Sequence, residues 1–423
     1  MSPIKRLLNN RDFISFIFLR LFLTLGIQMQ MSTISLQIYY EYTKDEFMLG
    51  LIGLAEAIPF ILLSFYSGYL ADKLNRKTII YIGSITLFLS SLFLVIFTEK
   101  TFYFFEHKPM WVLYLIVIIF GINRSFMAAA MQPFLTEIIP RELYTYSSSI
   151  NSGAWHLGAI LGPVLAGLLY SFKTNAALLN YCIVAILYFL AILCLFIIKH
   201  KGNHPINNKI SESVIKSIRE GILFVRKSKI LFGAISLDLL AVLFGGVSAI
   251  IPAFTDKILH LGPEYYGGLR TAPAIGALVM SLVLVFYLPT KNAGKYLLYS
   301  VALFGVFTIL FGISKNYWMA FWMLFLTGVF DSVSVVIRHS ILQLYTPDHL
   351  RGRVTAINGI FIGSSNELGA FESGLAARLM GLSTSIVFGG SVTILVVYLI
   401  HKTFPQLSKL DLSKINEEII EEK

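Results

Sequence analysis

Twelve long apolar stretches, separated by short polar segments, constrain this chain more than any other feature. They cover about 13–38, 47–70, 78–97, 110–135, 145–172, 176–198, 230–256, 265–288, 294–313, 317–345, 351–380 and 383–402. A helix needs roughly 20 mostly apolar residues to cross the hydrocarbon core of a bilayer. Because lipid offers no partners to backbone N–H and C=O groups, spans of this length must be helical. We therefore predict an all-α membrane protein with twelve transmembrane helices.

The charged residues are few and unevenly placed. Hydrophobic residues make up 56% of the chain and charged residues 14%, against about 25% charged residues in soluble domains. Of the 34 Lys and Arg residues, 23 lie in the N-terminal segment, in the alternate polar segments near 71–77, 141, 199–229, 291–295 and 351–353, and at or after the end of the last span. By the positive-inside rule, this asymmetry predicts that both termini are cytoplasmic. The net charge of +10 thus reflects topology, and we expect no nucleic-acid partner.

A polar segment at 199–229 divides the chain into two halves of six spans. We predict an N-terminal six-helix bundle (1–198), a cytoplasmic linker (199–229), a C-terminal six-helix bundle (230–403) and a cytoplasmic tail (404–423). Apolar residues recur in the linker at helical spacing, at Val214, Ile218, Ile222 and Val225. This spacing predicts an amphipathic helix, either on the inner membrane surface or solvated.

The two halves are related by an internal repeat. Residues from Gly121 and from Gly328 match without a gap, at Pro140 and Pro347 among other positions. We therefore expect two pseudo-symmetric bundles. Parallel repeats of this kind build transporters whose halves rock about a midplane site.

The segment "GYLADKLNRK" joins two apolar stretches and carries Gly68, Asp72, Arg76 and Lys77. It resembles the loop signature of the major facilitator superfamily, with Asn75 in place of the usual second glycine. Asn tolerates a left-handed backbone better than most residues. The resemblance implies a charge clamp at the inner gate between the two halves. Charges that merely obey the positive-inside rule are the alternative.

A second motif, "GAILGPVLAG", contains Gly158, Gly162, Pro163 and Gly167. It is similar to the fifth-helix motif of antiporters in the same superfamily, although Ala166 stands where a glycine is usual. Small residues allow close helix contacts and proline bends a helix, so simple packing without a coupling role is the alternative.

The resemblance covers about residues 10–400, and the chain is similar to the bacterial subgroup of enterobactin exporters and macrolide efflux pumps. It implies a secondary active transporter in the bacterial inner membrane. We expect export of a small amphipathic compound, siderophore or drug-like, by alternating access with proton antiport. A transporter of lysophospholipids or other lipids and a non-transporting receptor are the alternatives, because fold alone does not choose a substrate.

Several polar residues lie within the spans, where each costs free energy and is a functional candidate. Those we single out for the cavity or for proton coupling are Arg20, Glu56, Arg124, His156, Asp238 and Asp331. Repeat positions suggest the pairs Arg20 with Asp238 and Arg124 with Asp331, on the helices that line the cavity in this superfamily. Arg20 and Asp238 could instead be inner-gate residues, Glu56 could serve a polar group on a neighbouring helix, and His156 could be a packing residue.

Some chemistries find no support in the sequence. It has no phosphate-binding G-x-x-x-x-G-K-[ST] loop and no His/Cys cluster with metal-ligand spacing. We therefore expect no enzyme activity, cofactor or metal. The partners that we predict are a small-molecule substrate, protons and the lipid bilayer, and we expect a monomer. Arg338 lies seven residues after Asp331, and we assign it to the inner gate.

Overall fold

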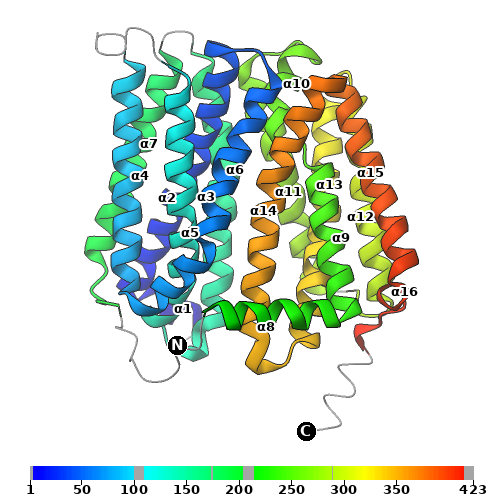
Figure 1. The fold of residues 1–423 in the computed structure, drawn as a ribbon. Helices are drawn as coiled ribbons and strands as arrows, with labels where there is room; N and C mark the ends of the chain where they lie inside the picture. Colours follow the sequence, from blue (N-terminus) through cyan, green and yellow to red (C-terminus); the bar gives the residue numbers. More distant parts are fainter. Residues whose placement is uncertain (1–2, 100–108, 173–174, 203–213, 288, 414–423) are drawn as a thin grey trace. The chain divides into compact units, whose positions relative to one another are not determined.

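The computed structural model describes residues 3–99, 109–172, 175–202, 214–287 and 289–413, and the long elements are all helices (Figure 1). The helices of the first half are α1 (Pro3–Leu8), α2 (Arg11–Gln37), α3 (Glu46–Lys73), α4 (Arg76–Thr98), α5 (Trp111–Ile138), α6 (Tyr144–Tyr170) and α7 (Ala176–Ile197). Those that follow are α8 (Val214–Lys227), α9 (Lys229–Gly245), α10 (Ile251–Lys257), α11 (Pro263–Phe286), α12 (Ala293–Gly312), α13 (Tyr317–Tyr345), α14 (Asp348–Met380), α15 (Leu382–Thr403) and α16 (Pro405–Ser408).

Within the described residues, 11 helical segments are long and apolar enough to cross a membrane. The predicted span at 351–380 corresponds to α14, which is not among them. Its sequence includes Glu367, Glu372 and Arg378 within one stretch of the helix, so its hydropathy is lower. The described part of the chain thus has eleven candidate spans. The twelfth span stays a prediction, as does the cytoplasmic side of the termini.

The chain forms two compact units. Unit 1 contains residues 1–44, 55–209 and 260–271, and unit 2 contains 45–54, 210–259 and 272–423. The division differs from a single cut at the linker because two helices change unit along their length. The first residues of α3 pack in unit 2, and the first residues of α11 pack in unit 1.

Unit 1 is built around α2, which packs along α6 and α7. Gly26 permits this approach, because a Cβ there would lie 2.7 Å from the ring of Tyr188. The same tyrosine donates a hydrogen bond to Gln30 at 2.8 Å, and Tyr181 donates one to Gln37 at 2.8 Å. Two polar groups of α2 are thereby satisfied within the helix packing.

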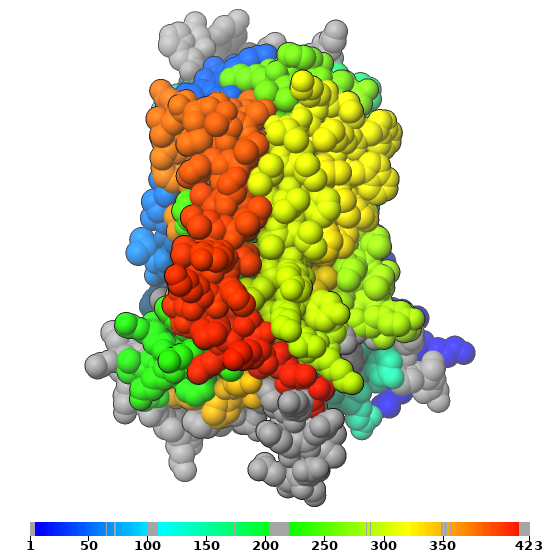
Figure 2. All heavy atoms as spheres, turned by 90° about the vertical axis from the view of Figure 1, so that its right-hand side faces the viewer, coloured from blue at the N-terminus to red at the C-terminus, as the bar shows by residue number. Residues whose placement is uncertain are grey.

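Unit 2 packs α12 against α13 and α15, and Figure 2 shows α12 and α15 side by side on one face. Large apolar side chains remain exposed along these two helices, including Tyr299, Leu303, Leu395 and Tyr398. In a chain with this many candidate spans, such a surface is suited to contact with lipid.

The predicted span at 230–256 is broken in the structure. Helix α9 ends at Gly245, a 3-10 turn covers Ser248–Ile250, and α10 begins at Ile251. A pair of glycines, Gly245 and Gly246, marks the break. The Ser373 hydroxyl donates a hydrogen bond to the Gly246 carbonyl, and so satisfies a backbone group near the interruption.

Helix α8 lies across one end of unit 2, where it packs on α14 (Figure 1). Glu220 of α8 forms an ion pair with Arg353 of α14. Gly221 meets Ile357, whose Cδ1 would lie 2.6 Å from an added Cβ. The amphipathic helix predicted for the linker corresponds to α8. Residues 203–213 of the linker and 414–423 of the tail lie outside the described residues.

Candidate functional site

A buried ion pair joins α9 to α13 in unit 2. Asp238 on α9 pairs with Arg338 on α13, and their side chains are 8% and 2% exposed. Arg338 is among the largest fully buried side chains of the described chain. Its Nε has no hydrogen-bond partner among the described atoms. Removing two charges from water costs several kcal/mol per ion, so a pair this deep requires a reason other than stability.

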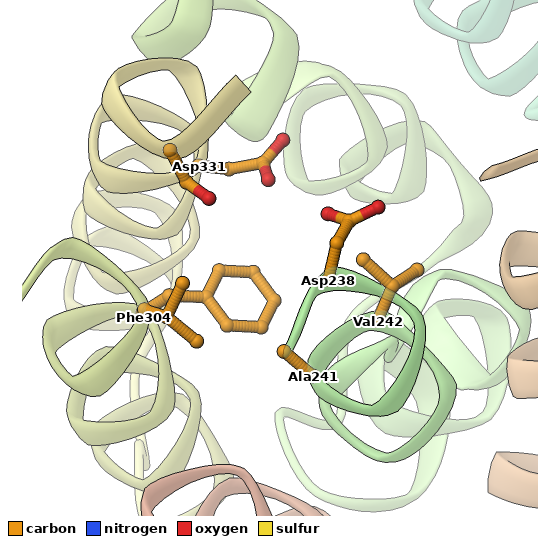
Figure 3. A pocket seen from close by; sticks show the side chains of 7 residues that line it. Asp238, Ala241, Val242, Phe304 and Asp331 are labelled. Carbon is orange, nitrogen blue, oxygen red and sulfur yellow. The ribbon is translucent and has the colours of Figure 1, made fainter. Parts of the chain in front are cut away.

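Asp331 lies beside this pair and faces a small cavity. The cavity is lined by Asp238, Ala241, Val242, Val301, Phe304, Asp331 and Ser334. Figure 3 shows both carboxyl groups on the same side of this space, with the Phe304 ring and Ala241 opposite them. Its free volume is about that of one water molecule. Asp331 is close enough to Asp238 and Arg338 for electrostatic interaction with both.

The charges of this cluster do not balance when both acids are ionised. Two carboxylates, Asp238 and Asp331, face one guanidinium, Arg338. One negative charge is left over in a setting where apolar residues from α12, Val301 and Phe304, form part of the wall. A proton taken up by one carboxyl group would make the cluster neutral. The arrangement can therefore bind and release a proton.

Unit 1 has an ion pair of its own within the spans. Arg124 on α5 pairs with Glu56 on α3, and the guanidinium lies over the Phe60 ring, 4.8 Å from its centroid. The backbone comes close at the same level, because a Cβ on Gly121 would lie 2.5 Å from the Glu56 carbonyl oxygen. Glu56 thus pairs with a polar group on a neighbouring helix, which was one of the two roles expected for it.

The structure gives several span charges partners on neighbouring helices of the same unit. Within unit 1 Arg124 pairs with Glu56, and within unit 2 Asp238 pairs with Arg338. The expected pairs of Arg20 with Asp238 and of Arg124 with Asp331 would join the two units, and they stay predictions. Arg338, which the sequence argument assigned to the inner gate, is buried against Asp238 within unit 2. Repeat symmetry relates equivalent positions in the two halves, whereas these ion pairs form between neighbouring helices of one unit.

The inner-gate motif is anchored in unit 1. Arg76 pairs with Glu137 of α5 at 2.6 Å, and the Lys77 Nζ donates to the Ile198 carbonyl at 2.5 Å. Asp72 lies in α3, but its side chain is outside the described part of the structure. A Cβ added to Gly68 would have no neighbouring atom within 4 Å. The clamp between the halves therefore stays a proposal.

Asn75 plays a different role from the one expected. Its φ of −63° is not left-handed, and its side chain accepts hydrogen bonds from the backbone N–H groups of Lys77 and Thr78. This is an N-cap for α4, for which asparagine is among the preferred residues. Its Nδ2 also donates to the Lys201 carbonyl at 2.6 Å. Asparagine at this position thus serves helix capping and loop attachment.

The glycines of the second motif mark close contacts of α6. A Cβ on Gly158 would lie 2.9 Å from the Leu25 nitrogen, and one on Gly162 would lie 2.6 Å from the Gln28 Cβ. Both neighbours belong to α2. On the α11 side, a Cβ on Gly167 would lie 2.8 Å from the Pro263 carbonyl oxygen. Pro163 stands inside α6 between these contacts.

We expect Gly162→Ala to lower the free energy of unfolding by about 1–3 kcal/mol, because the added methyl group overfills the contact with α2. Gly153 of the same helix is a matched control, because nothing lies within 4 Å of an added Cβ. Gly153→Ala should instead stabilise the helix by up to about 1 kcal/mol. Thermal unfolding of the purified variants in one detergent measures both. Equal midpoints for the two would contradict the close contact.

The remaining candidates lie in unit 1 and have few partners. His156 meets the Trp155 ring edge-on at 5.0 Å between centroids, and its Nδ1 has no hydrogen-bond partner among the described atoms. The Nε of Arg20 is also buried without such a partner. Arg270, within α11, is a span cation that our sequence argument did not single out. The available signal was a charged residue at the sixth position of the apolar stretch 265–288.

Comparison with known proteins identifies the family. Residues 16–370 match the Major Facilitator Superfamily. Over 380 residues the chain is 25% identical to the staphyloferrin A transporter of Staphylococcus aureus (strain NCTC 8325 / PS 47), and the match covers 88% of this chain and 91% of the relative. It is 24% identical over 361 residues to the enterobactin exporter EntS of Escherichia coli (strain K12), at 81% and 82% coverage. For the multidrug efflux pump Tap of Mycolicibacterium fortuitum the identity is 23% over 373 residues, with 86% and 88% covered.

Solved structures agree on the fold. A bacterial homolog of the human lysosomal transporter Spinster, in an inward-facing and unoccupied conformation, aligns with a TM-score of 0.71 at 14% identity, covering 93% of this chain and 98% of that one. The peptide transporter POT in complex with sulfate aligns with a TM-score of 0.74 at 12% identity, covering 95% and 96%. At such identities the likeness shows the fold alone.

Proposed function

This chain belongs to the major facilitator superfamily, and we propose that it is a proton-coupled exporter of a small amphipathic compound, siderophore or drug-like. It is a multi-pass membrane transporter and not an enzyme. Its curated relatives include a siderophore transporter, a siderophore exporter and a multidrug efflux pump. Export of a compound of one of these classes, by alternating access, is the finer part of the proposal.

The observation that supports coupling of transport to protons is the cluster of Asp238, Asp331 and Arg338. A carboxyl group that faces a water-sized cavity can exchange a proton with water when the cavity opens, and it can no longer do so when the cavity closes. Asp331 is the better candidate of the two acids, because Asp238 is already engaged by Arg338. We assign proton exchange to Asp331, and the positioning of its surroundings to the buried ion pair.

The proposed transport cycle also uses the two sequence motifs. Gly68, Asp72, Arg76 and Lys77 would stabilise one conformation as an inner gate. Helix α6, with its close contacts through Gly158, Gly162 and Gly167, would transmit motion as a rigid element. We propose that the protein acts as a monomer in a bacterial inner membrane, with both termini in the cytoplasm.

Transport by the purified protein in proteoliposomes tests this function. With an imposed pH gradient, substrate should accumulate against its own gradient, and a protonophore should abolish the accumulation. Candidate substrates come from a thermal-shift screen of siderophores, antibiotics and lysophospholipids. Proton-driven movement of lysophospholipid alone would support the lipid alternative, and gradient-independent binding without transport would indicate a receptor.

A further inference from the structure

We propose that the first residues of the linker, 198–202, form a strap on unit 1, and that Asn75 couples this strap to the inner-gate motif. The inference goes beyond the proposed export function and does not depend on it. Its basis is that one amide side chain holds both the strap and the start of α4. Because the strap begins the segment that joins the two halves, a pull on the linker acts directly on the motif.

The strap has no regular secondary structure, so its backbone polar groups need partners elsewhere. It follows α7, which ends at Ile197. Asp12, in the first turn of α2, accepts a hydrogen bond from the backbone N–H of Lys199 at 3.0 Å and another from that of His200 at 2.9 Å. Hydrogen bonds to a carboxylate are stronger than those between neutral groups. The strap is thus fastened to the start of α2.

Two side chains at the start of α4 hold the other backbone groups of the strap. The Lys77 Nζ donates to the Ile198 carbonyl at 2.5 Å. The Asn75 Nδ2 donates to the Lys201 carbonyl at 2.6 Å and to the Gly202 carbonyl at 3.2 Å. Each residue of the strap therefore has a backbone group that is bonded to a side chain of unit 1.

The amide of Asn75 makes hydrogen bonds at both of its ends. While its Nδ2 holds the strap, its Oδ1 accepts the backbone N–H of Lys77 at 2.9 Å and that of Thr78 at 3.3 Å. These N–H groups lie in the first turn of α4, where no helical partner is available. A glycine, the usual residue of the superfamily motif at this position, could make neither contact. Asparagine therefore links the position of the strap to the start of α4.

The strap meets Asn75 at a residue that must be glycine. Gly202 has a φ of +78°, which side chains rarely tolerate. A Cβ added to it would lie 2.5 Å from the Asn75 Oδ1. Both the backbone conformation and the available space therefore require glycine, and the contact is specific to this pair of residues.

A second contact joins the strap to the motif through Glu137 of α5. The Glu137 Oε1 pairs with Arg76 of the motif at 2.6 Å, and its Oε2 lies 3.6 Å from the His200 Nε2. The His200 ring also lies beside Phe134 of the same helix, with 6.2 Å between the ring centroids. The side chain of Glu137 is only 8% exposed. Detachment of the strap would therefore uncover the carboxylate that holds Arg76.

Hydrogen–deuterium exchange of the detergent-purified full chain tests the strap. Gly202→Ala strains the backbone and places a methyl group against Asn75, so the backbone N–H groups of Lys199 and His200 should exchange about tenfold faster or more. Gly381→Ala is the matched control, because Gly381 has a φ of +87° but nothing within 4 Å of an added Cβ. It should leave exchange in the strap unchanged. Unchanged exchange in Gly202→Ala, or equal acceleration in both variants, would overturn the proposal.

Exchange at the start of α4 tests the coupling through Asn75. Asn75→Gly removes both ends of the amide, so the N–H groups of Lys77 and Thr78 and those of the strap should all exchange faster. Asn75→Asp keeps an acceptor for α4 but sets a carboxylate oxygen against the carbonyl groups of the strap. Only the strap should then exchange faster, by about threefold or more.

Wild-type exchange of the strap in Asn75→Asp would show that the strap holds without Asn75 and would overturn the coupling. So would wild-type exchange at Lys77 and Thr78 in Asn75→Gly. Because exchange is measured without transport, a protein that fails to export would refute only the proposed function.

Discussion

Arg338→Met is expected to lower the free energy of unfolding by about 3–5 kcal/mol, the usual cost of leaving one partner of a buried ion pair without the other. Asp238 is 8% exposed and would then remain as an uncompensated buried charge, beside the second carboxyl group of Asp331. The thermal unfolding midpoint of the purified protein, with and without denaturant, measures the loss.

A double variant separates the charge from the packing. Arg338→Met with Asp238→Asn removes both charges and should recover most of the lost stability, because a neutral pair of similar volume carries no ionic desolvation cost. Arg353→Met is the matched control, since its pair with Glu220 is 32% and 39% exposed and should contribute only about 0–1 kcal/mol. Equal losses in Arg338→Met and Arg353→Met would contradict the buried pair.

Much of the fold could be predicted from the sequence because the bilayer imposes length and hydropathy on each span. The span boundaries of α2, α5 and α13 agree closely with the predicted stretches. The break between α9 and α10 was not predicted, because a pair of glycines in an apolar stretch is compatible with a continuous helix. Helix α14 shows the converse, since it is long and helical but more polar than the eleven candidate spans.

The site could be predicted only as a set of residues, not as a set of contacts. An ionisable residue in an apolar stretch is visible in the sequence, which is why Glu56, Arg124, Asp238 and Asp331 were identified. Their partners depend on which helix faces meet, and a single sequence does not contain this information. Arg338 was set aside because seven residues separate it from Asp331 on one helix, although its long side chain pairs across to α9.

The role of Asn75 also depends on a structural detail that the sequence does not contain. The departure from the superfamily motif was visible, but whether the residue adopts a left-handed backbone or caps a helix depends on where α4 begins. Because α4 begins at Arg76, asparagine precedes it directly and its side chain meets two free N–H groups. Only the observed helix start decides between the two explanations.

Asp331→Asn is expected to abolish substrate accumulation driven by a pH gradient while leaving equilibrium exchange of substrate within about twofold of the wild type. Asparagine has nearly the size of aspartate but carries no exchangeable acidic proton. It also removes the excess negative charge beside Asp238 and Arg338, so the cluster becomes neutral without a proton. Conformational change and substrate binding can then continue, but they are no longer linked to proton movement.

Two measurements on the same proteoliposomes distinguish coupling from general damage. Uphill export under an imposed pH gradient should disappear in Asp331→Asn, and a pH-sensitive dye should no longer report proton movement when substrate is added. Ser334→Ala, a neighbour in the same cavity wall, should retain both signals because it changes no charge. If Asp331→Asn still concentrates substrate against its gradient, Asp331 does not carry the coupling proton. The pair of Glu56 and Arg124 in unit 1 would then be the place to look, because there too a span carboxyl group faces a guanidinium.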